Sequence, residues 1–452
     1  MDLVAYVTRI RFGRGDRTRL GIKTGGDVAF ENGDELVELS EMMRRYAHLV
    51  VSYGLNVQAG QFVQINSEVA HRGLVRAVVE EAYRRGAGFV NVEFTDPMLT
   101  RARIVESRRE FLRDVPAFFA AKFNEIVDVG GANLKILGPE YPDHMIGLDP
   151  EAVNVVRKAS YSAAKHFYTD GIGRSRVQWC VIAAATPAWG ERVFPELKGA
   201  AAEERLWREI FKICRVERAD YLERWSRHNV ALKERAGILN RLKIRELRFT
   251  GPGSDLVVGL SQRSIFKAGV DRTPSGHDFS PNLPTEECFT TPDWRRTSGV
   301  VSATRPFYVN GNLIKDLRMS FKNGEISEFS CSEGRSTLEA YLTSDSGARR
   351  LGEVALVGTD SPVFRSGVVF QEILYDENAA CHIALGSAYK GCLEGGGALS
   401  DAECAEIGCN VSSVHTDIMI SSEEVTVRGV LEGGKTIALI ENGEWVGDLS
   451  AR

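Results

Sequence analysis

The chain has 452 residues, of which 43% are hydrophobic and 26% are charged, and its formal net charge is −5. The composition is that of a globular protein, and the length favours two domains. The slight negative charge argues against binding to nucleic acid through a basic surface. No apolar run approaches the ~18 residues of a membrane-spanning helix. From the charge we therefore expect no nucleic-acid partner, and from the lack of an apolar run we expect no membrane partner.

The N-terminal sequence and the cysteine content point to the cytoplasm. The stretch MDLVAYVTRIRFGRGDRTRL at residues 1–20 has basic residues but lacks the continuous apolar core of a secretory signal. Eight cysteines are spread along the chain without a C-x-x-C pair, which is typical of reduced thiols. A disulfide or a thiolate zinc site remains the less favoured alternative.

Residues 1–34 differ from the rest of the chain because basic residues and glycines dominate them. We interpret them as an N-terminal extension that is solvated and weakly paired. The alternative is an arm that contacts a partner subunit or an acidic surface.

Residues 35–240 predict an α/β domain. Apolar spacing indicates a helix, a strand, a helix and a strand at residues 35–55, 60–68, 71–87 and 88–96. Strand, helix and strand in such close succession form a βαβ unit, which implies a mainly parallel sheet. A later strand at 176–187 ends in Thr186 and Pro187, a hydroxyl cap followed by a first-turn proline, and helices are expected over 200–240.

Residues 241–452 predict a second domain of the α+β type, rich in antiparallel strands and with one or two inserted helices. Short alternating segments occur at residues 243–251, 254–261, 299–309, 313–322 and 325–332. Asn-Gly pairs at 310–311, 323–324 and 442–443 predict tight hairpin turns.

Several common catalytic motifs are missing from the sequence. The segments GIGRSR at 171–176 and GPGSDL at 251–256 do not complete the G-x-G-x-x-G pattern of dinucleotide enzymes. Neither a P-loop, a G-x-S-x-G nucleophile elbow nor an H-E-x-x-H zinc motif occurs.

Acids and histidines instead lie among apolar neighbours in the second half. In a strand, Glu353 would share an apolar face with Leu351 and Ala355, where an unpaired carboxylate is strongly disfavoured. His415 and Asp417 are two residues apart, so an extended chain points both to one side and can present a nitrogen and an oxygen to a metal. The stretches concerned are NLPTEECFTTPD at 282–293, LGEVALV at 351–357, YDENAACHIALGSAY at 375–389 and SVHTDIMI at 413–420.

The third stretch resembles a helix start, because Asp376, Glu377 and Asn378 are typical of a helix N-terminus. We therefore expect Glu377 at or before the cap and His382 projecting from the helix. Tyr389, seven residues further on, would lie on the same stripe as His382.

Each of these residues alone is more often structural than functional. Together they form a set rich in carboxylates, mixed with imidazole and free of thiolates, which is too acidic for one zinc ion. Such a set suits two divalent cations held by bridging carboxylates. The predicted ligands are Glu287, Glu353, Glu377, His382, His415 and Asp417.

The four stretches, in this order, resemble the thermophilic metalloaminopeptidases of peptidase family M29. The resemblance runs from about residue 36 to the C-terminus and includes VQWCVIAAATPAW at 177–189 and ALKERAGILN at 231–240. It implies that the six residues are the metal ligands and that Tyr389 is an active-site tyrosine. It also implies a cytoplasmic, homodimeric exopeptidase with two metal ions. Residues 1–34 precede the region of resemblance and depart from the family pattern.

The sequence thus predicts an aminopeptidase that releases N-terminal amino acids from peptides through a metal-activated water. We expect Glu353 to bridge two divalent ions (Zn, Co, Mn or Mg), Glu286 to move the proton to the leaving amine, and Tyr389 to donate a hydrogen bond to the oxyanion. Two alternatives remain: another dinuclear hydrolase, such as a deacylase or amidase, and a non-catalytic metal-binding dimer.

Overall fold

The computed structural model describes residues 38–450, so the predicted extension at residues 1–34 lies outside them. The chain from Leu39 onward forms one compact unit. Within residues 38–450, no helix is long and apolar enough to cross a membrane.

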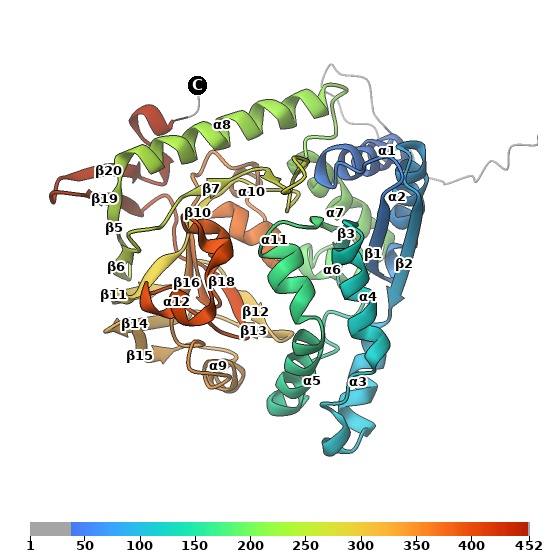
Figure 1. The fold of residues 1–452 in the computed structure, drawn as a ribbon, viewed down its shortest axis with the longest axis horizontal. Coiled ribbons are helices and arrows are strands. Elements are labelled where there is room, and N and C mark those ends of the chain that lie inside the picture. The colour runs from blue at the N-terminus through green and yellow to red at the C-terminus, as the bar shows by residue number, and fades with distance from the viewer. Residues whose placement is uncertain (1–37, 451–452) are drawn as a thin grey trace, which may run out of the picture. The chain divides into compact units, whose positions relative to one another are not determined.

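The first half contains a parallel sheet with the strand order β2-β1-β3-β4 (Figure 1). Its strands are β1 (Phe62–Glu68), β2 (Phe89–Thr95), β3 (Ala132–Leu137) and β4 (Gln178–Ala183). The predicted βαβ unit is confirmed, because α2 (Arg72–Arg84) joins β1 to the parallel strand β2. Strand β3 was not predicted, since Asn133 and Lys135 interrupt its apolar pattern.

Helices flank this sheet and lead into the second half. They are α1 (Leu39–Leu49), α3 (Pro97–Glu106), α4 (Ala117–Asp128), α5 (Pro150–Ala163), α6 (Pro187–Val193), α7 (Ala200–Ile213) and α8 (Tyr221–Leu242). The helix start predicted at Thr186 is confirmed, because its hydroxyl accepts a hydrogen bond from the Trp189 amide at 3.2 Å.

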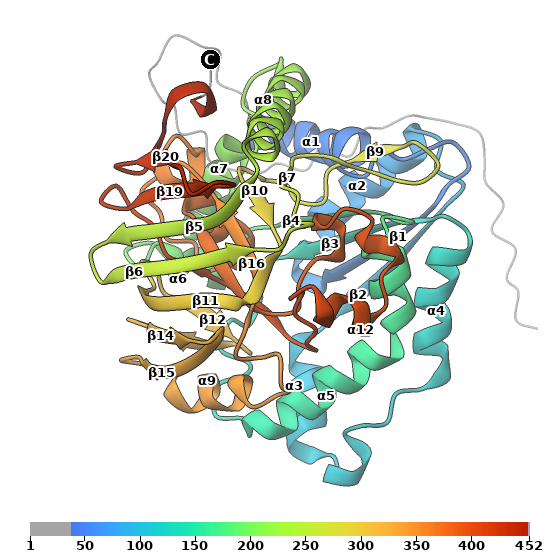
Figure 2. The same cartoon turned by 60° about the vertical axis from the view of Figure 1, so that its left-hand side comes forward.

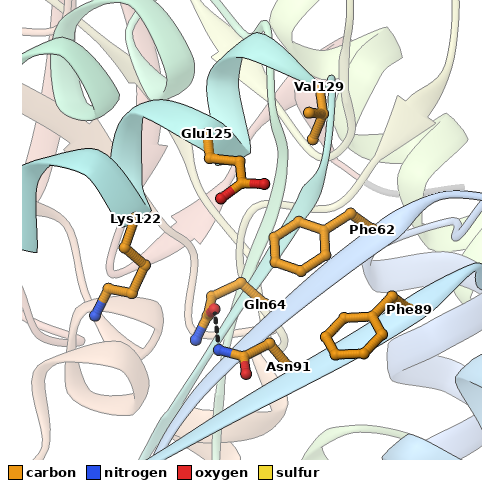
Figure 3. A pocket seen from close by; sticks show the side chains of 7 residues that line it. All are labelled: Phe62, Gln64, Phe89, Asn91, Lys122, Glu125 and Val129. Carbon is orange, nitrogen blue, oxygen red and sulfur yellow. Dashed lines mark hydrogen bonds between the residues drawn. The ribbon is translucent and has the colours of Figure 1, made fainter. Parts of the chain in front are cut away.

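One face of the parallel sheet carries amide side chains that bond to one another. Asn91 donates to Gln64 at 2.8 Å, and Asn66 donates to Asn133 at 2.9 Å. A cavity of about 430 Å³ opens where β1 and β2 begin, and Figure 3 shows its lining side chains. The cavity is lined by Phe62, Gln64, Phe89, Asn91, Lys122, Glu125 and Val129. None of these is a residue predicted for the metal site.

The second half is built from two antiparallel sheets (Figure 2). The larger has the order β15-β14-β11-β6-β5-β19-β20-β21, and the smaller has the order β18-β17-β16-β10-β7. The larger consists of β5 (Ile244–Gly251), β6 (Ser254–Leu260), β11 (Pro292–Ser302), β14 (Arg318–Lys322), β15 (Glu325–Ser330), β19 (Thr426–Leu431), β20 (Thr436–Glu441) and β21 (Glu444–Trp445). The smaller consists of β7 (Lys267–Ala268), β10 (Cys288–Thr290), β16 (Leu351–Leu356), β17 (His382–Gly386) and β18 (His415–Met419).

All three predicted Asn-Gly hairpins are present. They join β12 (Phe307–Val309) to β13 (Asn312–Ile314), β14 to β15, and β20 to β21. The asparagine and the glycine both have positive φ in every case, as a type I′ turn requires. Inserted helices include α9 (Arg335–Leu342) and α12 (Asp401–Glu406).

The hydrophobic core of this half lies between the two sheets. The row Val354, Ile383 and Ile418 of the smaller sheet belongs to the same buried cluster as Leu247 and Val258 of the larger. Side chains alternate along a strand, so the neighbours of that row point to the opposite face of the smaller sheet. That face carries most of the predicted site.

Candidate metal centre

The centre is built on one row of cross-strand neighbours in the smaller sheet. Glu353 of β16 pairs with Ala384 of β17, which pairs with Asp417 of β18. Paired residues lie on the same face, so the two carboxylates flank the alanine. Because Ala384 has only a methyl group, space remains between them.

Two histidines lie on the same face because each precedes a member of this row by two residues. His415 Nε2 lies 3.4 Å from Glu353 Oε2 and 3.4 Å from Asp417 Oδ1. His382 Nε2 lies 3.1 Å from Glu287 Oε2, in the segment that leads into β10. The predicted one-sided arrangement of His415 and Asp417 is therefore present.

The ligand atoms form two groups that share one residue. Atoms of Glu287, Glu353 and His382 lie within 4.8 Å of one another, and so do atoms of Glu353, His415 and Asp417. Glu353 is thus the only one of these five residues that belongs to both groups.

The local structure predicted around Glu377 and His382 was wrong. Helix α11 (Ile373–Asp376) ends before Glu377, which begins a single 3-10 turn, and Ala380 is already extended. His382 then opens strand β17, and Tyr389 follows that strand in a loop. Pairing of β17 between β16 and β18 overrides the local helix-start signal.

Glu377 and Tyr389 nevertheless lie close to the other residues. The Glu377 carboxyl is buried, and its electrostatic neighbours include Asp417 and Glu287. The Tyr389 ring lies 5.1 Å from the His415 ring, centroid to centroid, and the residue is 42% exposed. Burial among surrounding atoms raises the pKa of Tyr389 well above its ordinary value, and the nearby Glu353 raises it further.

Glu286 points elsewhere. Its Oε1 accepts a hydrogen bond from Arg215 Nη2 at 2.7 Å, and its Oε2 lies 3.4 Å from His228 Nε2. Neighbouring residues of an extended chain point to opposite sides, which explains why Glu286 and Glu287 diverge. The structure therefore brings the six predicted ligands and Tyr389 together, and it places Glu286 with Arg215 and His228.

The sequence matches the family described as thermophilic metalloprotease (M29) over residues 39–445. The chain belongs to this family. Relatives include aminopeptidase T from Thermus aquaticus, 38% identical over 407 residues, and aminopeptidase PepS from Streptococcus thermophilus, 35% identical over 412 residues. These matches cover 90% and 91% of this chain and 99% of each relative.

The fold is also that of a solved structure. Wild-type AmpT from Thermus thermophilus superposes with a TM-score of 0.83 at 37% identity, covering 91% of this chain and all of the other. The α/β architecture predicted from the sequence is confirmed.

The charge balance of this M29 site calls for cations. Four buried carboxylates, those of Glu287, Glu353, Glu377 and Asp417, surround two imidazoles. Burial raises the pKa of Glu353 to about 7 and the pKa of Glu377 well above its ordinary value. Burial alone would lower the pKa of His382, but Glu287 more than offsets it and raises that pKa well above 6.5. Buried acids in such excess are stable when they coordinate metal ions.

Both histidines are oriented as metal ligands usually are. Nδ1 of His415 donates to the Ser387 carbonyl at 2.8 Å, and Nδ1 of His382 donates to the Ala380 carbonyl at 3.2 Å. This arrangement directs Nε2 of each ring at the carboxylates, so that it could give its lone pair to a cation bound among them. Glu287 Oε2 is buried and, although His382 is near, accepts no well-aligned hydrogen bond from any residue between 38 and 450. The residues present therefore fit divalent cations.

Sequence reasoning missed three contributors to this site. Arg215 comes from the first half and carries no motif, and Ser387 acts through its carbonyl, which leaves no trace in the sequence. Asn378 accepts a hydrogen bond from the Glu286 amide at 2.6 Å and thereby ties the turn of Glu377 to the acidic pair.

Proposed function

We propose that this M29 family member is a dinuclear-metal aminopeptidase that releases N-terminal amino acids from peptides. The observation that carries the proposal is the membership of Glu353 in two separate groups of ligand atoms. A carboxylate has two oxygens and can serve two cations at once. The names of the M29 relatives, aminopeptidase T and PepS, support the choice of substrate.

In this proposal, Glu287, Glu377 and His382 hold one cation and His415 and Asp417 hold the other. Bound divalent cations would polarise the scissile carbonyl and lower the pKa of a water molecule towards neutrality. The ions are of the Zn, Co, Mn or Mg type, since the donors are carboxylates and imidazoles without thiolates. Glu353 connects the two groups and fixes their relative position.

Tyr389 is proposed to stabilise the oxyanion. Its ring lies beside His415, and no residue among 38–450 forms a hydrogen bond with its hydroxyl, which leaves that donor for substrate. Glu286 remains the candidate for transfer of the proton to the leaving amine, because it adjoins Glu287. Its carboxylate oxygens, one of which is paired with Arg215, are the atoms that would take up and pass on the proton.

A deacylase or amidase with two metals remains the second candidate, because the ligand set does not select for a free α-amine. Hydrolysis of amino-acid p-nitroanilides, compared with their N-acetylated forms, separates the two enzymes. An aminopeptidase cleaves the free amines, and chelator abolishes the cleavage. A deacylase prefers the acetylated compounds, and a non-catalytic metal-binding dimer cleaves neither.

Three further parts of the proposal follow, the location and the dimer from the family resemblance and the domain division from the sequence pattern. We propose that the enzyme is a cytoplasmic homodimer, and that residues 35–240 and 241–452 act as separate domains with the metal centre in the second. Light scattering at several protein concentrations tests the dimer. Limited proteolysis near residues 240–243 tests the domain boundary.

A further inference from the structure

The extended segment that begins at the metal ligand Glu287 carries two further residues on the same side. Glu287, Phe289 and Thr291 occupy alternate positions along it, and side chains alternate along an extended chain. Phe289 of β10 pairs with Ala355 of β16, which pairs with His382 of β17. This register places Phe289 on the face of the smaller sheet that carries the metal ligands.

Phe289 and Thr291 both contact Tyr389, the residue proposed to stabilise the oxyanion. The Phe289 ring meets the Tyr389 ring edge to face, with centroids 6.0 Å apart and planes at 74°. The Thr291 hydroxyl donates a hydrogen bond to the Tyr389 carbonyl at 2.8 Å. One contact supports the ring and the other holds the main chain, and both come from the segment that supplies the ligand Glu287.

The loop around Tyr389 is anchored on either side of this residue. Before it, the Ala388 amide donates to the Asn410 carbonyl at 3.0 Å, and after it, the Cys392 carbonyl accepts from the Ile265 amide at 2.9 Å. The Tyr389 carbonyl also accepts from the Cys392 amide of its own turn, at 3.0 Å. Within residues 38–450, the threonine hydroxyl is therefore the only donor to this carbonyl that comes from outside the loop.

Thr291 is itself held in one conformation. The residue is 1% exposed, and its carbonyl accepts a hydrogen bond from the Ser264 hydroxyl. A β-branched side chain has few rotamers, and the residue before a proline, here Pro292, is restricted to extended backbone. The hydroxyl is therefore directed at the Tyr389 carbonyl by the protein alone, without help from a substrate.

We propose that Thr291 is a positioning residue for Tyr389. It holds the main chain of Tyr389 so that the phenol stays beside His415, where the ring centroids are 5.1 Å apart. The inference rests on the proposed aminopeptidase function and on the oxyanion role of Tyr389 within it. A displacement of about 1 Å in a positioned group can cost about 10²-fold in rate, so a catalytic residue in a loop needs such support.

The test is Thr291→Val in the metal-loaded enzyme, with leucine p-nitroanilide as substrate. Valine keeps the branching of the side chain and removes only the hydroxyl, and the Tyr389 carbonyl keeps the Cys392 amide as a partner. We expect kcat to fall by about 10–100-fold with little change in KM, and metal content to stay parental. Thr291→Ser keeps the hydroxyl and should retain most of the parental kcat.

Thr290→Val is the matched control. Thr290 is also buried, and its hydroxyl donates to the Ile265 carbonyl at 2.9 Å. It pairs with Val354 of the hydrophobic core, so it lies on the other face of the smaller sheet. Thr290→Val should therefore lower the midpoint of thermal unfolding, as Thr291→Val does, but keep the parental kcat.

The Tyr389→Phe background tests whether Thr291 acts through the phenol. There, Thr291→Val should lower kcat no further, because the hydroxyl that it positions is already gone. A further fall of kcat in this background, or loss of metal in Thr291→Val, would assign Thr291 to the support of Glu287 and overturn the proposal.

A parental kcat in Thr291→Val overturns the proposal, and so does an equal fall of kcat in Thr290→Val. If Thr291→Val does not fold, Thr291→Ser is compared with Thr291→Ala, and an equal kcat in these two overturns it. Failure of the loaded parent to cleave leucine p-nitroanilide rejects the proposed function itself. A low kcat in Tyr389→Phe beside a parental kcat in Thr291→Val rejects only the role of Thr291.

Discussion

Glu286 and Glu287 are adjacent in the sequence, yet their carboxylates have different partners: Arg215 lies 2.7 Å from the first, and His382 lies 3.1 Å from the second. One residue therefore faces the metal ligands, and the other faces a basic pair from the first half of the chain. This divergence makes the role of Glu286 directly testable.

If Glu286 transfers the proton, Glu286→Gln should lower kcat by roughly 10²–10⁴-fold while metal content stays parental. The matched variant Arg215→Gln leaves the carboxylate in place, so it should retain more activity. Both changes should also lower the free energy of unfolding by about 1–3 kcal/mol, because each leaves a buried polar group without its partner. A parental kcat in Glu286→Gln, with only stability lost, would assign Glu286 to holding Arg215 and His228.

Metal removal should abolish hydrolysis, and Co²⁺, Zn²⁺ or Mn²⁺ should restore it. The same ions should raise the midpoint of thermal unfolding, because they bind the folded chain and relieve the buried acids around Glu353. Elemental analysis should give two ions per chain. Full activity in excess chelator, at less than one ion per chain, would reject the two-metal site.

His415→Ala should remove metal and activity together. His228 of α8 is unsuitable as a control, because its Nε2 lies 3.4 Å from Glu286 and bonds to the Thr285 carbonyl at 2.8 Å. His166 is the better control, since its partner is Asp170, outside the site, and its side chain is 38% exposed. The ligand assignment fails if His415→Ala and His166→Ala bind the same amount of metal.

Tyr389→Phe should lower kcat by roughly 10²–10³-fold with little change in KM, because the hydrogen bond forms mainly in the transition state. Metal content and thermal stability should stay parental, since the ring still packs on His415 and Phe289. Steady-state kinetics on a leucine substrate, with metal analysis of the same sample, decide the point. Unchanged kcat would leave Tyr389 with a packing role, and loss of metal would make it a residue that orients His415.

Stability at acid pH should depend on His71. Its Nε2 donates to the Gly138 carbonyl at 2.6 Å, and its Nδ1 accepts from Ser67 at 3.0 Å, so the ring is held neutral. Burial lowers its pKa from 6.5 to about 4. The unfolded chain therefore takes up a proton first, and stability that is complete above pH 6.5 is lost as pH falls towards 4, by at most about 3 kcal/mol.

His71→Gln should consequently be less stable at neutral pH but lose less stability on acidification. Urea unfolding at pH 7 and at pH 4.5 measures the difference. An equal loss in the parent and the variant would show that other groups cause the acid sensitivity.

The family, the α/β class and the hairpins could be predicted because they depend on local signals. The spacing of His415 and Asp417 gave their common face, and Asn-Gly pairs marked the turns. The helix expected over Glu377 to Tyr389 was wrong because strand pairing with Ala355 and Met419, which are 27 and 37 positions away, decides the conformation of His382. The basic neighbours of Glu286 could not be foreseen, since no local pattern links Arg215 to a segment some 70 residues further on.

The row Glu353, Ala384 and Asp417 makes the site sensitive to chain length and not only to residue identity. Deletion of one residue between His382 and Ala384, or next to Asp417, would turn the following side chains from the metal face to the hydrophobic core. Insertions in the loop from Ser387 to Val414 leave that parity untouched, because the loop is not part of the ladder. The loop that carries Tyr389 can therefore change in length without reversing the faces of the ligands, whereas a single-residue insertion or deletion inside β17 or β18 would reverse them.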